Sequence, residues 1–298
     1  MLINKYKAEF FQFCIQLTAD NYRDKRTKRI GAMDWHCIRC CNLKKQLLRS
    51  ILMANYIIQI SDDALMEMSI AALEAYVVPQ RQANKSGERL KKEVETYGLL
   101  WGHGVTLPDG DILYSVQKLT VDAMAYRRTD SVLPSEGLKV IKDMITSYWP
   151  QYSFLGDFHS HPYEHYNDVE RIRGYEFSEV DRKSMIDEQN DPDFRVSLVM
   201  TISSLERISN IQPENISDSI ICWTFNNYRF WLNACIVYKG DEDDEIALLP
   251  NSSHWKNKYD YPDDVDNVYL HCPYLSHPWQ TTKFGKKAGI GKHIAGDI

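Results

Sequence analysis

The sequence contains no apolar stretch long enough to cross a bilayer. None of its hydrophobic runs reaches the roughly 18 uncharged residues that a membrane-spanning helix needs, so we expect no membrane partner. The short apolar run near the N-terminus is flanked by Lys5, Lys7 and Glu9, and no small-residue cleavage site follows it. We therefore do not expect a signal peptide.

The cysteines do not form a regular pattern. There are seven, an odd number, without the even spacing of a disulfide framework in a small secreted domain. A reducing, cytoplasmic location is the simpler expectation. Cys37 and Cys40 form a Cys-x-x-Cys with His36 and Cys41 beside them, but no second pair completes a structural zinc site. We interpret them as cysteines packed on or near a helix.

Charge is unevenly distributed along the chain. The formal net charge of -6 argues against a general nucleic-acid binder, so no nucleic-acid partner is expected. Residues 1–50 nevertheless carry eleven Lys and Arg against four Asp and Glu, a net +7, which leaves -13 for the remainder. The basic segment is either a solvated helical face or a docking surface for an acidic partner.

Changes in composition and periodicity divide the chain into three parts. Helical spacing predicts a basic, helical N-terminal extension over residues 1–54. Alternating helix and strand patterns over 55–240 predict a mixed α/β domain. Residues 241–298 begin with an acidic run and end in a Gly- and Lys-rich segment, which predicts a polar, flexible tail.

Within the central domain, periodicity predicts the individual elements. Ser61 is placed to cap a helix, Pro-Asp-Gly at 108–110 predicts a hairpin turn, and the polar stretch 79–93 predicts a loop or frayed helix. The expected strands are 56–60, 95–105, 111–121, 152–162, 194–203, 219–225 and 228–240, and the expected helices are 62–76, 135–148 and 178–189.

Two histidines on one predicted strand are candidate metal ligands. His159 and His161 are two residues apart, so both imidazoles point to the same face of the sheet. Such pairs also occur on ordinary strand faces. Downstream, Ser178 and Asp181 have the Ser-x-x-Asp spacing of a helix start, which is either a plain capping box or a way to present Asp181 as a third ligand.

Two imidazoles and one carboxylate would leave the fourth position of a tetrahedral Zn²⁺ open to water, as in catalytic zinc sites. Zinc lowers the pKa of such a water towards about 7. Hydrolysis of an amide also needs a base that later protonates the leaving amine. The candidate is Glu95, at the start of a predicted strand and close to Gly98 and Gly102.

Together these residues resemble the JAMM motif of the JAB/MPN metalloprotease family. That motif is a glutamate, then His-Ser/Thr-His, then Ser-x-x-Asp, and here it reads Glu95, His159-Ser160-His161-Pro162 and Ser178-x-x-Asp181. The flanking words "ETYGLLWG" and "GDFHSHP" are similar to the strands that carry the family's motif, and "IIQISDDALMEMSIAALEA" resembles its first strand and helix. The resemblance covers residues 55–240 and leaves 1–50 and 241–298 unexplained.

The resemblance implies an MPN-type α/β fold, a mixed sheet flanked by helices, and a zinc-dependent hydrolase. Its substrates would be peptide or isopeptide bonds at the C-terminus of ubiquitin or a ubiquitin-like protein. The implied partners are that modifier and its conjugates, with E1/E2-like conjugation enzymes as further candidates. In this scheme His159, His161 and Asp181 hold one Zn²⁺, Glu95 moves the proton, and Ser178 donates a hydrogen bond to the oxyanion.

One departure from the family pattern stands out. The segment between His161 and Ser178 is about nine residues longer than usual, and we assign the excess to an insertion within residues 163–177, at the rim of the expected cleft. Glu164 and His165 within it are alternative ligands. Two other functions stay open at this point: a non-catalytic scaffold that binds ubiquitin-like partners, and a zinc amidase acting on a small molecule.

Overall fold

A computed structural model of the chain describes residues 55–84, 87–108, 110–187, 193–209, 211–239, 246–250 and 268–276. All of them belong to one unit of the chain, Leu52–Ile298. The helical extension expected over residues 1–54 lies outside the described residues. Among the described residues, no helix combines the length and apolar character that a membrane span requires.

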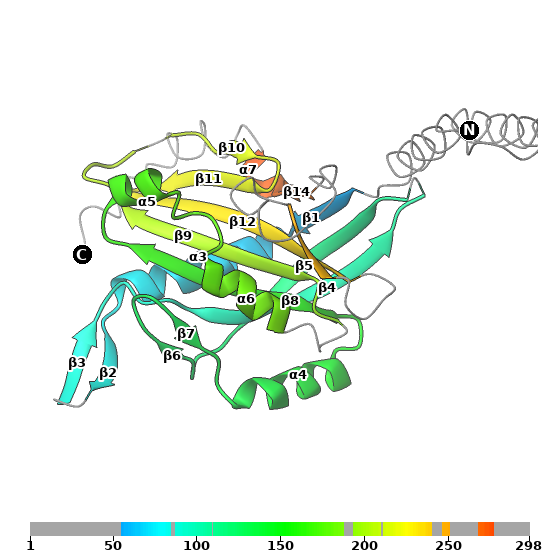
Figure 1. Ribbon diagram of the computed structural model, residues 1–298, viewed down its shortest axis with the longest axis horizontal. Helices are drawn as coiled ribbons and strands as arrows, with labels where there is room; N and C mark the ends of the chain where they lie inside the picture. Colours follow the sequence, from blue (N-terminus) through cyan, green and yellow to red (C-terminus); the bar gives the residue numbers. More distant parts are fainter. Residues whose placement is uncertain are drawn as a thin grey trace, which may run out of the picture. The chain divides into compact units, whose positions relative to one another are not determined.

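A large mixed β-sheet forms the centre of this unit (Figure 1). Its strands follow the order β10-β11-β12-β9-β8-β4-β5-β1-β14, and β13 pairs with β12. Strands β1 and β5, β1 and β14, and β8 and β9 pair in parallel, while the other neighbours are antiparallel. The strands of this sheet are β1 (Tyr56–Ile60), β4 (Tyr97–Thr106), β5 (Ile112–Val121), β8 (Ser153–Tyr163), β9 (Val196–Ser204), β10 (Glu214–Ser217), β11 (Ile220–Phe225), β12 (Tyr228–Lys239), β13 (Ile246–Leu249) and β14 (Val268–His271).

Helices and two small hairpins surround the sheet. The helices are α3 (Asp62–Val77), α4 (Gly137–Tyr148), α5 (Tyr166–Ile172), α6 (Glu179–Asp187) and α7 (Pro273–Ser276). The hairpins are formed by β2 (Gln80–Asn84) with β3 (Gly87–Lys91), and by β6 (Tyr126–Arg127) with β7 (Val132–Leu133). Ser61 caps α3, because its side chain accepts a hydrogen bond from the Ala64 amide at 3.2 Å.

Alternate residues of the central strands pack on opposite faces of the sheet. One apolar cluster joins α3 to residues such as Leu198 and Met200 of β9. The other joins α4 and α6 to residues such as Val199 of the same strand and Trp101 of β4. This is the period of two expected for a strand buried on both faces. The sheet therefore has a helix-covered core on each side, and the fold belongs to the mixed α/β class.

The structure confirms each strand and helix expected within residues 55–240, with ends that differ by a few residues. Two interpretations are wrong. The polar stretch 79–93 forms the β2–β3 hairpin rather than a loop or frayed helix. The segment 241–298 is not a tail throughout, because β13 extends the sheet at β12 and β14 pairs with β1. The limit expected at residue 240 is therefore not the end of the sheet.

Candidate metal centre

A bulge in β8 decides which way the two histidines face. In the pairing of β4 with β8, Leu100 is opposite Gly156 and Trp101 is opposite Phe154, so Leu155 is an extra residue. A bulge of this kind changes which residues point to a given face. Phe154 accordingly packs with the α4 and α6 cluster, whereas Leu155 and Phe158 pack with the α3 cluster. Residues 159 and 161 thereby face α6.

Gly156 makes this bulge possible. Its φ is +151°, and a Cβ at this position would overlap the carbonyl oxygen of Val196 on the neighbouring strand β9. Because the obstacle is backbone, no side-chain rotation can relieve the overlap. The glycine three residues before His159 is therefore a structural requirement of the site.

The start of α6 brings Asp181 to the histidines. The Asp181 carboxylate accepts a hydrogen bond from the Ser178 amide at 2.6 Å, and the Ser178 hydroxyl accepts one from the Asp181 amide at 3.2 Å. The capping box expected from Ser-x-x-Asp is thus present. The capping box also holds the aspartate in place, because the same oxygen, Oδ2, accepts the Ser178 hydrogen bond and faces His161.

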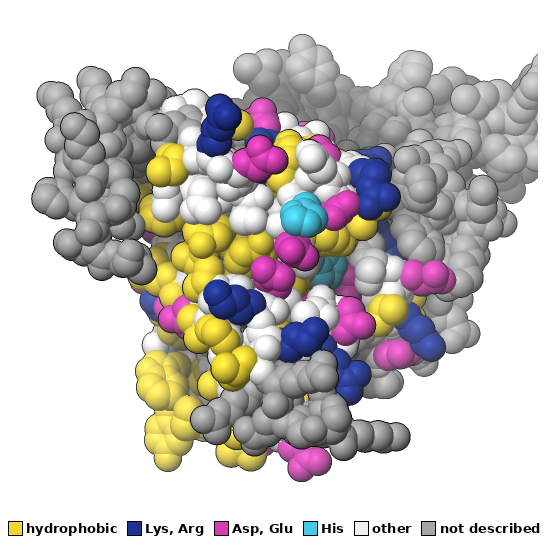
Figure 2. Space-filling view, turned by 90° about the vertical axis from the view of Figure 1, so that its left-hand side faces the viewer, with side chains coloured by type: hydrophobic (Ala, Val, Ile, Leu, Met, Phe, Trp, Pro, Cys, Tyr) yellow, Lys and Arg dark blue, Asp and Glu magenta, His cyan; other side chains and the backbone are white. Residues whose placement is uncertain are grey.

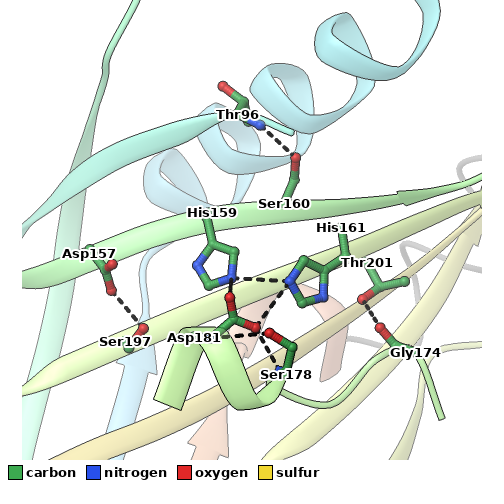
Figure 3. Close-up of polar contacts among 10 residues, drawn as sticks. All are labelled: Thr96, Asp157, His159, Ser160, His161, Gly174, Ser178, Asp181, Ser197 and Thr201. Atoms are coloured by element: carbon green, nitrogen blue, oxygen red, sulfur yellow. Dashed lines mark hydrogen bonds and ion pairs between the residues drawn. The ribbon is translucent and has the colours of Figure 1, made fainter. Parts of the chain in front are cut away.

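Ligand-type atoms of three residues, His159, His161 and Asp181, lie close together (Figure 3). Nε2 of His159 lies 3.2 Å from Nε2 of His161, and the two carboxylate oxygens of Asp181 lie 3.3 Å from one imidazole nitrogen each. Ligands about 2.0–2.1 Å from a tetrahedral zinc ion are separated from one another by about 3.3 Å. The two imidazole nitrogens, and each nitrogen and the carboxylate oxygen facing it, are thus separated by about the distance between two ligands of a tetrahedral zinc ion, and this group could hold a metal ion.

Electrostatics of the cluster are dominated by Asp181. Burial alone would lower the pKa of His159, but its hydrogen bond to Asp181 and that residue's charge raise the pKa from 6.5 to about 9. Burial alone would raise the pKa of Asp181, but its bonds to His159 and His161 hold it far below its ordinary value. Without a metal, the site therefore retains a proton that a divalent cation would have to displace.

Glu95 lies next to this group, on the segment that leads into β4. Tyr97 pairs with His159, and Thr96 and Ser160 are joined by two 3.0 Å hydrogen bonds. Continuing this register places Glu95 opposite His161, on the face that carries the histidines. The Glu95 amide also donates to the carbonyl of Arg128 at 2.7 Å, which fixes the backbone at this point.

The environment of Glu95 suits a group that accepts and returns a proton near neutral pH. The residue is only 8% exposed, and burial raises its pKa from 4.5 to about 7. His159 opposes this rise in pKa, whereas the charge of Asp181 adds to it. A carboxyl with a pKa near the working pH is an effective general base.

The site opens to solvent on one side. Side chains of His159 and His161 are nearly buried, but that of Asp181 is 15% exposed, and Ser178 lies at the surface. On the face shown in Figure 2, histidine side chains lie among acidic side chains, with hydrophobic side chains beside them. Ser178 accepts its capping bond through an oxygen lone pair, so its hydroxyl proton stays available to a ligand.

The alternative ligands named from the sequence are not part of the group. Glu164 and His165 are highly exposed and 3.9 Å from each other, and neither belongs to the three-residue group. Cys37 and Cys40 lie outside the described residues. The stretch assigned to an insertion contains the helix α5.

Sequence reasoning missed one close neighbour of the ligands. Phe177 is buried, and its ring centre lies 6.1 Å from that of His159. An apolar residue directly before the Ser-x-x-Asp start was the available signal, because such residues often pack beneath a helix N-terminus.

Comparison with known proteins adds little to this geometry. No protein-family model matches the chain, and no curated protein matches it. Among solved structures, the chain is similar to the N-terminal domain of STIL from Trichoplax adhaerens at 11% identity, with a TM-score of 0.27. The match covers 64% of this chain and 45% of that one. A likeness this slight identifies neither a fold family nor a function.

Proposed function

We propose that the protein is a zinc-dependent metallopeptidase of the JAB/MPN type, with an MPN-like domain starting at β1. The observation that carries the proposal is the meeting of His159, His161 and Asp181, with contacts of 3.2 to 3.3 Å between their ligand atoms, beside a buried glutamate of raised pKa. Each feature occurs separately in ordinary proteins. Their combination, in the order of the JAMM motif, is what a hydrolytic zinc site requires.

A zinc ion bound by these three residues would supply a Lewis acid and lower the pKa of a water molecule. The chain's own groups would then transfer the proton and stabilise the developing negative charge. Glu95 takes a proton from the attacking water and gives it to the leaving amine, which a pKa near 7 allows in both directions. The exposed Ser178 hydroxyl donates a hydrogen bond to the oxyanion of the tetrahedral intermediate.

As substrate we propose the extended C-terminal tail of a ubiquitin-like protein, joined to its target through a peptide or isopeptide bond. The site supports this choice because Ser178 is exposed and the Asp181 side chain is 15% exposed, so a large substrate can reach the site from that side. An extended chain is also the form in which peptide tails are commonly recognised. E1/E2-like conjugation enzymes that act on the same modifier would be natural partners.

Cleavage of ubiquitin-like fusions, with and without a chelator, tests the proposal. The wild type should cleave, the chelator should stop cleavage, and added zinc should restore it. Glu95→Gln should bind zinc normally but lose turnover, whereas Glu136→Gln, the same change at an exposed glutamate of the α4 N-cap, should retain both. Turnover by Glu95→Gln at the wild-type rate would refute the assigned base. Zinc binding by a wild type that cleaves none of the fusions would favour the scaffold reading.

A further inference from the structure

The chain between α5 and α6 determines where Asp181 lies. α5 ends at Ile172, its C-cap Arg173 has a left-handed conformation with φ +54°, and the residues from there to Ser178 belong to no helix or strand. This segment, residues 174–177, directly precedes the capping box. Any movement of the segment would therefore move Asp181 relative to the two histidines.

A buried hydroxyl from the sheet holds the first carbonyl of this segment (Figure 3). Thr201 of β9 donates a hydrogen bond to the carbonyl oxygen of Gly174 at 3.0 Å, and its side chain is fully buried. In the parallel pairing of β8 and β9, Thr201 is the partner of His161. The residue that holds the segment is thus fixed in register with a ligand.

A buried amide holds the next carbonyl. Asn233 of β12 is 6% exposed and donates from Nδ2 to the carbonyl oxygen of Tyr175 at 3.2 Å. Between these two bonds the backbone approaches Tyr163 closely, because a Cβ at Gly174 would lie 2.5 Å from that tyrosine's ring. The segment consequently has little freedom to shift toward or away from the sheet.

Aromatic packing holds the same segment. Tyr166 of α5 and Tyr175 within the segment stack on Trp231 of β12 with ring centres 5.9 and 6.3 Å away, and Arg229 lies over the same indole. Phe177, the last residue of the segment, is buried next to His159. The bonds of Thr201 and Asn233 therefore act on a segment that aromatic packing also holds, so they decide its finer placement.

From these contacts we infer that Thr201 and Asn233 are positioning residues for the metal site. They hold residues 174–177 against the sheet and so place Asp181 at the distance from His159 and His161 that zinc requires. Metal sites tolerate errors of only about 0.2 Å in ligand distance, so a small shift of α6 would weaken binding. The inference rests on the proposed function only in naming zinc as the cation; the placement of Asp181 can be tested without metal.

The test compares Thr201→Val, which removes the hydroxyl, with Thr201→Ser, which keeps it. Thr224→Val is the matched control, because Thr224 donates a 2.9 Å hydrogen bond to the carbonyl of Ile211 outside this segment. Asn233→Leu provides an independent variant if Thr201→Val does not fold. Two quantities are measured: zinc affinity by competition with a chelator, and hydrogen exchange of the Ser178 and Asp181 amides in the zinc-free protein.

Thr201→Val and Asn233→Leu should weaken zinc binding measurably, by up to about the 10- to 100-fold that follows the loss of a group bonded directly to a metal ligand. Both should also accelerate exchange at the two amides, while Thr201→Ser and Thr224→Val should stay close to wild type. Thr201→Val with wild-type zinc affinity or unchanged exchange would overturn the inference. A wild type that binds no zinc would instead overturn the proposed function, and the exchange data would still decide whether Thr201 places Asp181.

Discussion

The carboxylate of Asp181 lies 3.3 Å from Nε2 of His159, although the two residues stand on different elements, α6 and β8. This contact gives His159 a pKa of about 9 in the metal-free protein. It connects the protonation of the site, its affinity for a cation and the placement of the α6 N-terminus.

Zinc binding should release about one proton per ion at pH 7, because His159 is protonated below about pH 9 and only a neutral imidazole binds a metal. The apparent affinity should accordingly fall as the pH is lowered from 9. Calorimetric titration in two buffers of different ionisation enthalpy measures the number of protons. Equal heats in both buffers would show that the site holds no such proton.

Glu95→Gln should stabilise the zinc-free protein at alkaline pH. Burial raises the folded-state pKa of Glu95 from 4.5 to about 7. The protonated side chain therefore makes its full contribution to the free energy of unfolding below pH 4.5, and this contribution is lost as the pH rises through 7. A glutamine does not ionise, so the variant should gain on the order of 1–3 kcal/mol over wild type between pH 5 and pH 8. Urea unfolding in the presence of a chelator measures this.

The control for that experiment is Glu136→Gln at the exposed N-cap of α4. Its free energy of unfolding should differ from that of wild type by the same amount at pH 5 and at pH 8. A gain of stability in Glu136→Gln as large as that in Glu95→Gln would mean that net charge, rather than the buried carboxyl, is responsible.

Two substitutions of Ser178 should separate its structural role from its chemical one. Ser178→Ala removes the helix cap and should cost about 1 kcal/mol of folding free energy, whereas Ser178→Gly should cost only a few tenths. Both lack the hydroxyl, so both should lower turnover by about 100- to 1000-fold. Thermal unfolding and cleavage assays on the same samples give the comparison. If turnover instead follows folding free energy, so that Ser178→Gly turns over at close to the wild-type rate, then Ser178 acts only as a helix cap.

Much of this arrangement could be predicted from the sequence. The spacing of His159 and His161 predicts that they lie on one strand face, and the spacing of Ser178 and Asp181 predicts a helix start. Both features can be predicted because the patterns are local in sequence. The pairing of β14 with β1 could not be predicted in this way. Its partner strand lies at the opposite end of the described chain, and a four-residue strand carries little periodicity of its own.

The β2–β3 hairpin and the hydrogen bonds that hold residues 174–177 could not be predicted from the sequence, for different reasons. The hairpin is formed by polar residues without the alternation of a half-buried strand, so its sequence resembles a loop. Thr201 and Asn233 stand in apolar strands, and their partners are backbone carbonyls, which have no signature in the sequence. Only the folded structure brings these donors to the segment.

Gly156→Ala should destabilise the protein by about 3 kcal/mol or more, because the added methyl group would overlap the backbone of β9. Gly104→Ala on β4 is the control. There the added carbon would approach only the Tyr114 ring, at 3.1 Å, and the position is exposed, so a cost of about 1 kcal/mol or less is expected. Urea unfolding measures both. Equal stabilities for the two variants would contradict the role assigned to the bulge.

Equilibrium dialysis against zinc, followed by metal analysis, measures whether His159, His161 and Asp181 form a zinc site. The variants are His159→Ala and His161→Ala, with His165→Ala as the matched control at an exposed position in the 163–177 segment. Wild type and His165→Ala should each bind one zinc ion per chain, and the other two variants should bind none. A wild-type protein without zinc, or zinc retained in both His159→Ala and His161→Ala, would show that these residues do not form a zinc site.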